Sequence, residues 1–308
     1  MGYFLGFIAP LRDPQGRFRA SWGGQPTMYD YWTKESYSGF VAESGYHKAR
    51  ITELQDRGCE VIFSVGGAAA APLEEKIEPT EAVTEYLACL DNYNTSYLDF
   101  DIEGSALTSP EMMDRHIQVL LGLRDQRPDL RISHTFAVDI DGWNHHTIAL
   151  VKKMAAVEYV PDIVQGMLME MRDPDNDYWK ATRMAAEAMV TQMTDSSAWG
   201  HVWDRPAAYR HFGACPMYGV NNNNKIFTLE HMEKLLHYAK EHQIAVLSGW
   251  DAWRDNNQCN PEAGINPPCK TVPPLSHADN KYACTHVQQQ PGEFSRLVAA
   301  YTPQTVAR

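Results

Sequence analysis

Short apolar runs rich in β-branched and aromatic residues recur along the chain, and segments with helical spacing separate them. These runs predict eight strands. They cover Tyr3–Ile8, Phe18–Trp22, Glu60–Val65, Tyr97–Glu103, Arg131–Val138, Ile163–Met169, Ala214–Val220 and Ile244–Trp250. Because strands alternate with helices, we expect the strands to pair in parallel through right-handed crossovers.

The segments between the strands carry the start and stop signals of helices. Ser109, followed by a proline, predicts an N-cap, and Thr228 predicts another. A third helix is expected to begin at Thr80. Gly58 stands where a preceding helix needs a C′ residue.

This order of elements predicts an α/β fold, namely a single-domain (β/α)₈ TIM barrel over residues 1–308. An open doubly wound sheet is the alternative, but it usually has a Gly-rich loop after the first strand, where this chain has Ala9 and Pro10. Residues 256–290 are rich in Cys, Pro and Asn and lack periodicity. They predict an irregular loop decorating the barrel, before a final helix over about residues 292–301.

The charge balance narrows the range of partners. The chain has 27 Lys and Arg against 39 Asp and Glu, a formal net charge of −12. A nucleic-acid-binding protein needs a surplus of basic residues, so we expect no nucleic-acid partner. No stretch approaches the roughly 18 apolar residues of a membrane helix, and no signal-peptide pattern precedes Tyr3. We therefore expect no membrane partner. We also expect the protein to be a monomer.

The six cysteines include no Cys-x-x-Cys pair, which disfavours a zinc ribbon. Cys259, Cys269 and Cys284 lie in the predicted irregular loop. We expect one disulfide among them, preferably Cys259 to Cys284, with Cys269 free or joined to another cysteine. Such a bridge favours an oxidising compartment and hence an extracellular protein. Cys59 and Cys89 are expected to be buried thiols.

Three carboxyl groups alternate along one predicted strand. Asp99, Asp101 and Glu103 share one face of that strand because successive side chains point to opposite faces. Inside a barrel, burial and mutual repulsion should raise the pKa of at least one of them. A carboxylic acid that keeps its proton at neutral pH is what a general acid for glycosidic cleavage needs. Glu103 is our candidate, since it lies last in the strand, at the mouth where barrel active sites form.

Two other interpretations of these carboxyl groups are weaker. A metal site would be expected to have a histidine or an oxygen-rich loop nearby, and neither is present. A solvated edge strand is disfavoured because a barrel has no edge. We therefore expect neither a metal nor another cofactor.

The same segment resembles the DxxDxDxE signature of glycoside hydrolase family 18, the retaining chitinases and their relatives, at its three chemically decisive positions. Four further segments resemble strands of that family in the same order along the chain. They are Ser64–Gly67, Met167–Glu170, Pro216–Asn221 and Leu247–Asn256. The most similar subgroup is that of the compact bacterial chitinases, which lack an inserted α+β domain.

The chain departs from the family pattern at several positions. Ser96 stands where the signature usually begins with Asp. Glu170 replaces an Asp, and Met169 replaces the Tyr that many members use to hold the acetamido oxygen. Gly249 and Trp253 differ from the bulkier and charged residues expected there. These departures affect the expected substrate preference more than the reaction class.

The resemblance implies hydrolysis of β-1,4 bonds in chitin or another N-acetylglucosamine-containing glycan by a substrate-assisted retaining mechanism. Glu103 would be the general acid and base. The nucleophile would be the carbonyl oxygen of the substrate's own 2-acetamido group. Asp101 would orient that group, and Asp99 would set the position and pKa of Asp101.

The resemblance also indicates where the sugar binds. The expected substrate-binding residues are Trp250 at the floor, Met169 and Met217 around the acetamido group, and also Glu170, Tyr218, Asn221 and Trp22. Two alternatives share this machinery or fold: an endo-β-N-acetylglucosaminidase acting on N-glycans, and a non-catalytic chitin-binding or lectin-like protein. Proteins of the second kind typically lose the acid, and Glu103 is present.

Overall fold

The computed structural model describes residues 1–256 and 284–303, which form two compact units. Unit 1 comprises Met1–Phe136 and His145–Asp162. Unit 2 comprises Ala137–Asn144 and the described residues from Ile163 onward.

The strands of unit 1 include a run of parallel neighbours, as the sequence predicts for an α/β fold. The order is β7-β6-β5-β1-β2. These strands are β1 (Gly2–Arg12), β2 (Phe18–Trp22), β5 (Glu60–Gly66), β6 (Tyr97–Asp101) and β7 (Arg131–Ala137). Strands β1, β5, β6 and β7 pair in parallel. Side chains such as Phe63, Phe100 and Ile132 are fully buried and form the core of this unit.

Strand β2 corrects the expectation that all eight strands pair in parallel, because it runs antiparallel to β1. Only residues 13–17 link the two strands. Asp13 fixes this turn: its Oδ1 accepts hydrogen bonds from the backbone N–H groups of Gln15 and Arg17, both at 2.9 Å. A parallel crossover needs about a dozen residues or more, so this link permits only a hairpin.

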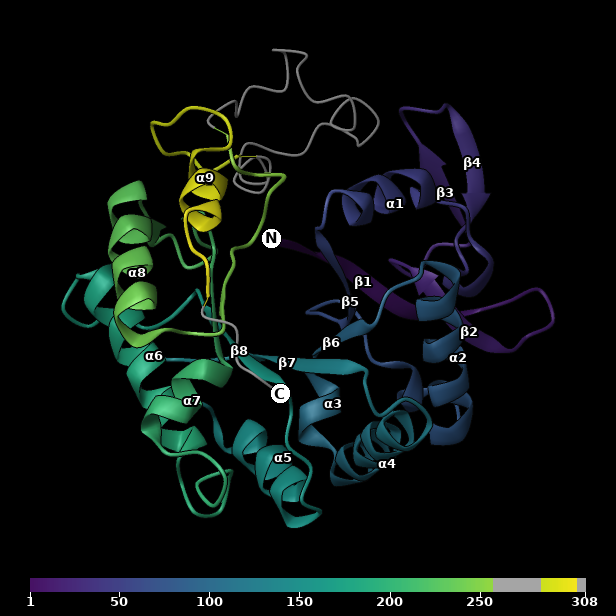
Figure 1. Ribbon diagram of the computed structural model, residues 1–308, viewed down its shortest axis with the longest axis horizontal. Coiled ribbons are helices and arrows are strands. Elements are labelled where there is room, and N and C mark those ends of the chain that lie inside the picture. Colours follow the sequence, from purple (N-terminus) through teal and green to yellow (C-terminus); the bar gives the residue numbers. More distant parts are fainter. Residues whose placement is uncertain (257–283, 304–308) are drawn as a thin grey trace. The chain divides into compact units, whose positions relative to one another are not determined.

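The helices of unit 1 follow the predicted signals. They are α1 (Lys48–Asp56), α2 (Pro79–Asn92), α3 (Ser105–Thr108), α4 (Pro110–Gln126) and α5 (His145–Ala156), with 3₁₀ turns at Val41–Glu43 and Leu73–Glu75. Ser109 caps α4 by accepting a hydrogen bond from the N–H of Met112. Gly58 follows α1 with φ +76°. Helices α2 and α4 lie side by side (Figure 1). A hairpin of β3 (Thr27–Asp30) and β4 (Glu35–Ser38) is an addition that the pattern did not indicate.

Unit 2 has three parallel strands in the order β12-β9-β8. They are β8 (Ile163–Leu168), β9 (Phe212–Pro216) and β12 (Val246–Leu247). Strands β9 and β12 end before the predicted strands Ala214–Val220 and Ile244–Trp250 do. The predicted strand Ala214–Val220 is interrupted after Pro216, and Gly219–Val220 is a separate strand, β10, that pairs antiparallel with β11 (Ile226–Phe227).

The helices of unit 2 are α6 (Tyr178–Met193), α7 (Arg205–His211), α8 (Leu229–His242) and α9 (Glu293–Ala299). Thr228 caps α8, as expected, and forms a capping box with His231. Helices α6 and α8 contact each other (Figure 1). Asp255 accepts hydrogen bonds from the first turn of α9, at 3.2 Å from Phe294 N and 2.7 Å from Ser295 N.

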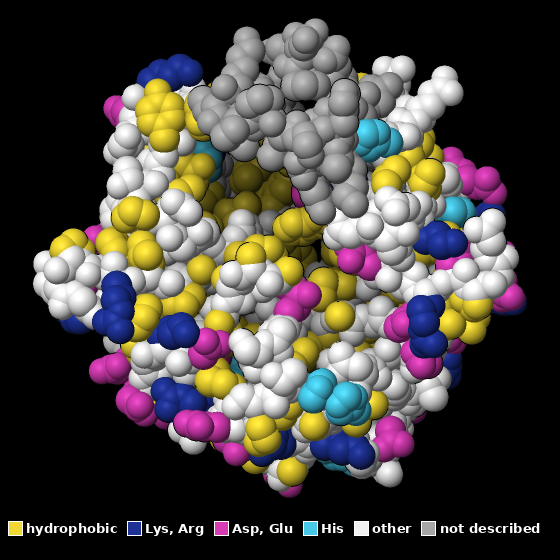
Figure 2. Space-filling model, turned by 180° about the vertical axis from the view of Figure 1, so that it is seen from behind, with side chains coloured by type: hydrophobic (Ala, Val, Ile, Leu, Met, Phe, Trp, Pro, Cys, Tyr) yellow, Lys and Arg dark blue, Asp and Glu magenta, His cyan; other side chains and the backbone are white. Residues whose placement is uncertain are grey.

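On the face in Figure 2, the coloured Lys and Arg side chains are interspersed with Asp and Glu side chains. Each helix in the described ranges is too short or too polar to span a bilayer.

The described cysteines fall into two states. Cys284 is disulfide-bonded, whereas Cys59, Cys89 and Cys215 form no disulfide. Cys89 is buried, as expected, and burial raises the pKa of its thiol well above the ordinary value. Cys59 lies in the short link between α1 and β5 and is only half-buried, which corrects the expectation that it is a buried thiol. Cys259, Cys269 and most of residues 256–290 lie outside the described residues.

Candidate active site

Asp99 accepts hydrogen bonds from three hydroxyl groups in the interior of unit 1. Ser64 Oγ lies 2.7 Å and Ser133 Oγ 2.5 Å from its carboxylate oxygens, and Thr135 Oγ1 lies 3.0 Å and 3.2 Å from the two. The parallel register places Ser64 of β5 and Ser133 of β7 directly opposite Asp99 of β6. Burial raises the pKa of Asp99 to about 6, although the three hydroxyl donors lower it.

Asp101 lies two residues further along the same face and is 6% exposed. Its Oδ1 has no hydrogen-bond partner among the described residues. Burial raises its pKa well above the ordinary value, and the charges of Glu103 and Asp99 raise it further. The expectation that at least one carboxyl of this row has a raised pKa is therefore confirmed.

Glu103 completes the row at a partly exposed position. Strand β6 ends at Asp101, so Glu103 follows the strand instead of lying within it as predicted. The chain then turns at Gly104, which has φ +56° and precedes α3. The three carboxyl groups therefore become progressively more exposed from Asp99 to Glu103.

The opposite face of β6 packs against a buried polar network that the sequence reasoning missed. The ring of Phe100 contacts Tyr86, His116 and His134. Glu74 accepts a hydrogen bond from Tyr86 Oη at 2.8 Å and lies 2.5 Å from His116 Nδ1, and His116 Nε2 lies 3.2 Å from His134 Nε2. His134 alternates with Ser133 and Thr135, so β7 is polar on both faces. That alternation is the signal that could have revealed the network.

Burial lowers the pKa of His134 well below its ordinary value, and the neighbouring charges of His116 and Arg124 lower it further. Its Nδ1 has no hydrogen-bond partner in the described ranges. His134 is therefore a neutral imidazole in the folded protein.

Trp22, one of the expected substrate-binding residues, lies in the core of unit 1. It is 6% exposed. Its ring makes edge contacts with Phe63, Tyr93 and Tyr46, and its Nε1 donates a hydrogen bond to Tyr93 Oη at 3.2 Å. Aromatic neighbours of the same unit thus occupy its surroundings.

In unit 2, the residues after β9 and β12 meet. Met217 and Trp250 form a parallel bridge, in which Trp250 N donates to Pro216 O and Tyr218 N donates to Trp250 O, both at 2.8 Å. Met217 is buried, whereas 40% of Trp250 is exposed. Trp250 therefore offers an aromatic surface at the carboxyl end of this sheet segment.

Tyr218 is buried next to this bridge, and its ring stacks on Phe294 with 4.8 Å between ring centres. Gly249 lies against the same ring. Burial raises the pKa of the Tyr218 hydroxyl well above the ordinary range. The side chain therefore acts as a neutral group there.

The residues after β8 carry two more predicted contacts. Met169 is half-buried, and Glu170 is exposed with a left-handed backbone, φ +56°. Asn221 is fully buried. Its Oδ1 accepts hydrogen bonds from Glu170 N at 3.0 Å and Tyr178 Oη at 2.9 Å, and its Nδ2 donates to Met217 O and Gly219 O. In this structure Asn221 joins the loops after β8 and β9.

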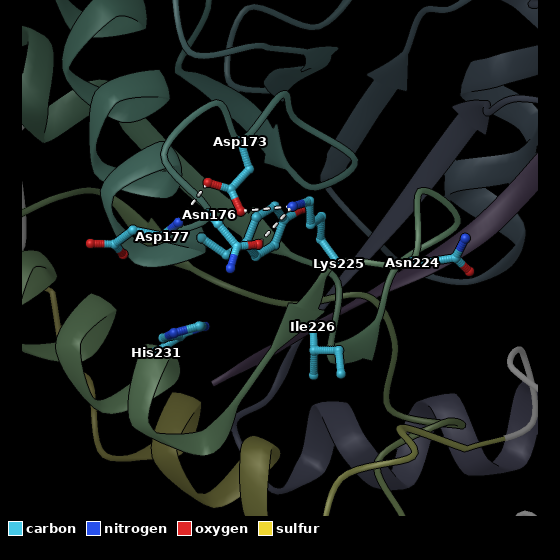
Figure 3. Close-up of a pocket in the computed structure, with 8 residues that line it drawn as sticks. Asp173, Asn176, Asp177, Asn224, Lys225, Ile226 and His231 are labelled. Atoms are coloured by element: carbon cyan, nitrogen blue, oxygen red, sulfur yellow. Dashed lines mark hydrogen bonds and ion pairs between the residues drawn. The ribbon is translucent and has the colours of Figure 1, made fainter.

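A pocket of about 550 Å³ lies elsewhere in unit 2. Asp173, Asn176 and Lys225 point toward one another there (Figure 3), with Lys225 Nζ 3.1 Å from Asp173 Oδ2 and 3.2 Å from Asn176 Oδ1. Its lining residues are Asp173, Asn176, Asp177, Tyr178, Asn224, Lys225, Ile226 and His231. None of the predicted site residues lines it. Within the described part of the chain, no cluster of three or more His, Cys, Asp or Glu could hold a metal ion.

No protein-family model matches the chain. Among solved structures, it resembles the catalytic domain of a hyperthermophilic chitinase from Pyrococcus furiosus, with 22% identity and a TM-score of 0.74 over 97% of this chain and 85% of that one. A family 18 chitinase from Pseudoalteromonas aurantia matches with 13% identity and a TM-score of 0.54, over 81% of this chain and 85% of that one. The chain has the fold of the family 18 chitinases.

Sequence relatives are consistent with this chitinase fold. A probable bifunctional chitinase/lysozyme of Escherichia coli and endochitinase 11 of Metarhizium anisopliae are each 23% identical over 225 residues, which is 67% of this chain. The matches span 24% and 42% of those proteins, respectively. The chain thus covers less than half the length of either relative.

Proposed function

We propose that this chain is a chitinase-like glycoside hydrolase that cleaves β-1,4-linked N-acetylglucosamine glycans with retention of configuration. The observation that carries this proposal is the row of Asp99, Asp101 and Glu103, in which two buried carboxyl groups with raised pKa values precede a partly exposed third. Keeping several acids together in a desolvated strand is costly, and such arrangements concentrate at catalytic sites. The similarity in fold to chitinase catalytic domains supports the same activity.

Each carboxyl has a distinct role in this proposal. Glu103, being partly exposed, protonates the glycosidic oxygen and later deprotonates the attacking water. Asp101 has a buried oxygen that lacks a partner among the described residues, and it accepts a hydrogen bond from the substrate's acetamido N–H. This bond favours the ionised form of Asp101, which then stabilises the positive charge of the oxazolinium intermediate. Asp99, held by three hydroxyl groups, fixes the position of Asp101 and takes up its proton.

The fold we infer for the whole chain is a (β/α)₈-type barrel. Parallel strands joined by helices within each unit support it, as does the match to the Pyrococcus furiosus domain over 97% of the chain. A barrel would collect the carboxyl ends of β6, β8, β9 and β12 at one mouth. Trp250, Met217, Met169, Glu170 and Tyr218 would then serve the sugar bound at Glu103.

The decisive experiment is product analysis on chito-oligosaccharides with detection of the anomeric form. We expect β-anomeric products, inhibition by a thiazoline that mimics the oxazolinium, and no cleavage when glucosamine replaces N-acetylglucosamine at the cleaved position. A Pyrococcus furiosus chitinase variant has been crystallised with chito-oligosaccharides, which makes these suitable substrates. Efficient cleavage of cellulose oligomers would contradict the proposal, because they lack the acetamido nucleophile.

Two alternatives can be separated in the same experiment. An endo-β-N-acetylglucosaminidase would release the glycan from a high-mannose glycoprotein, whereas a chitinase would prefer chito-oligosaccharides. A chitin-binding protein without activity would bind these sugars and leave them intact. We favour hydrolysis because Glu103 is present at the end of the acid row.

The setting of the activity is part of the proposal. The disulfide bond of Cys284 supports an oxidising, extracellular environment. A monomer acting on chitin-type oligosaccharides, without a metal or other cofactor, is the simplest assembly consistent with the proposed chemistry.

A further inference from the structure

Three consecutive asparagines in unit 2 hold the loop that follows β8. Asn221 Oδ1 accepts the N–H of Glu170 at 3.0 Å, Asn222 Nδ2 donates to the Glu170 carboxylate oxygen Oε1, and Asn223 Nδ2 donates to Met171 O at 3.0 Å. We call Asn221, Asn222 and Asn223 the asparagine clasp. Each member holds a different atom of two adjacent residues.

Glu170, which the asparagine clasp holds, has an unfavourable backbone conformation. Glu170 has φ +56°, a left-handed conformation that costs a non-glycine residue free energy. Its side chain is nevertheless exposed, so it is not held there by packing in the core. The hydrogen bonds of the clasp offset this strain. Residues held in a strained backbone conformation cluster at functional sites.

The first member of the clasp, Asn221, is anchored in the interior of unit 2. Asn221 is fully buried, and its amide makes hydrogen bonds to the loops after β8 and β9 and to Tyr178 of α6. The asparagines lie in the turn between β10 and β11, and their hydrogen bonds therefore join this turn to the loop after β8 at Glu170. Glu170 remains exposed, and its Oε1 accepts the hydrogen bond from Asn222.

We propose that Asn222 is a positioning residue that orients the Glu170 carboxylate as a hydrogen-bond acceptor for N–H or O–H groups of a neutral, hydroxyl-rich glycan. This inference rests on the proposed function, and it deepens that function by naming a determinant of substrate affinity. Because Asn222 acts through Glu170 and not on the reacting bond, its removal weakens binding and leaves the chemical step unchanged.

The test compares Asn222→Ala, Glu170→Ala and the double variant in steady-state hydrolysis of chito-oligosaccharides. We expect Asn222→Ala to raise KM about tenfold with kcat within about twofold of the wild type, which corresponds to about 1.4 kcal/mol. In the Glu170→Ala background, Asn222→Ala should have no further effect on KM, since the group that it orients is gone. Asn222→Gln, which keeps the amide, should recover part of the affinity.

The matched control is Asn224→Gly. Asn224 belongs to the same asparagine run but has φ +64°, which glycine adopts without strain, so KM should stay at the wild-type value. An additive effect of Asn222→Ala in the Glu170→Ala background would overturn the inference, as would an unchanged KM. An inactive, non-binding wild type would overturn the proposed function itself. If the wild type is active and Asn222→Ala leaves KM unchanged, only the positioning role of Asn222 would be overturned.

Discussion

The ring of Tyr218 occupies the space in which a side chain at position 249 would begin. A Cβ built on Gly249 would lie 2.1 Å from Tyr218 Cε1 and 2.3 Å from both Cζ and Oη. The absence of a bulky residue at position 249, which departs from the family pattern, is therefore matched by an aromatic side chain from the end of β9. The two positions have to be considered as a pair.

Gly249→Ala should destabilise unit 2 by about 1–3 kcal/mol, the usual cost of overpacking. The new methyl group can be accommodated only if Tyr218 moves off Phe294 or the backbone after β12 shifts. Chemical denaturation of the variant measures this cost. In the Tyr218→Ala background the same substitution should cost much less, because the clashing ring is absent. Strictly additive effects would show that the ring and the glycine do not constrain each other.

The acid row was predictable from the sequence because strand periodicity depends only on local backbone geometry. Two-residue spacing places Asp99 and Asp101 on one face of β6 whatever the surrounding fold, and Glu103 follows directly after the strand ends. The same alternation places Phe100, which lies between Asp99 and Asp101, on the opposite face. Helix caps such as Ser109 could likewise be recognised, because the capping interaction is confined to four consecutive residues.

Features that depend on distant contacts were not predictable. The antiparallel direction of β2 follows from a short link clamped by Asp13, which the apolar pattern does not record. The burial of Trp22 depends on Tyr46 and Tyr93, which come from other parts of the chain. His116 and His134 come from a helix and a strand, and only the tertiary fold brings them together.

Asp99 should make the wild type less stable as the pH rises from about 4 to about 6. In the unfolded chain its carboxyl ionises near pH 3.8, whereas in the folded protein its pKa is about 6. Between these values the folded state holds a proton that the unfolded state has lost, so raising the pH favours unfolding by about 1.4 kcal/mol per pH unit. Asp99→Asn removes this contribution. Between pH 4 and pH 7, the free energy of unfolding of the variant should therefore rise by about 3 kcal/mol relative to that of the wild type.

Urea denaturation at several pH values measures this difference. Asp56→Asn, at an exposed aspartate in the last turn of α1, is the control for loss of a carboxyl group outside the interior. A constant offset between Asp99→Asn and wild type across the pH range would show that Asp99 ionises as freely in the folded protein as in the unfolded chain.

His134 should contribute the opposite trend. Its pKa in the folded protein lies well below the ordinary value of 6.5, so below pH 6.5 the unfolded chain binds a proton that the folded protein excludes. Acidification therefore destabilises the fold through this residue by about 1.4 kcal/mol per pH unit. His134→Phe fits between Phe100 and Phe136, which both stack on the imidazole. It should lower stability at pH 7, because His116 loses a partner, and should reduce the sensitivity to acid.

The same denaturation series tests this prediction, with the exposed His201 replaced by Phe as the control. If His134→Phe and the wild type lose stability in parallel from pH 6.5 to pH 5, then His134 is protonated in the folded protein.

The disulfide of Cys284 should be the one bridge of the protein. Of the six cysteines, Cys59, Cys89 and Cys215 form no disulfide, so alkylation in denaturant without reductant should label four cysteines, these three and one more, and leave one pair that includes Cys284 unlabelled. A bridge closing a loop of 10 to 25 residues stabilises the fold by about 3 kcal/mol in the chain-entropy model. Reduction should therefore lower the unfolding temperature. Mass spectrometry that finds Cys284 alkylated before reduction would contradict the bridge.

Replacing Glu103 by glutamine should separate catalysis from folding and binding. The side chain is partly exposed and follows β6, so Glu103→Gln removes the acidic proton without disturbing the hydroxyl cradle of Asp99. We expect kcat on chito-oligosaccharides to fall by at least about 10²-fold, the lower end of what a positioned general acid contributes. Oligosaccharide affinity and the unfolding temperature should stay close to those of the wild type. Glu111→Gln, at an exposed glutamate in the first turn of α4, should retain full activity. Turnover by Glu103→Gln near the wild-type rate would remove Glu103 from the mechanism and leave the acid row without a proton donor at its exposed end.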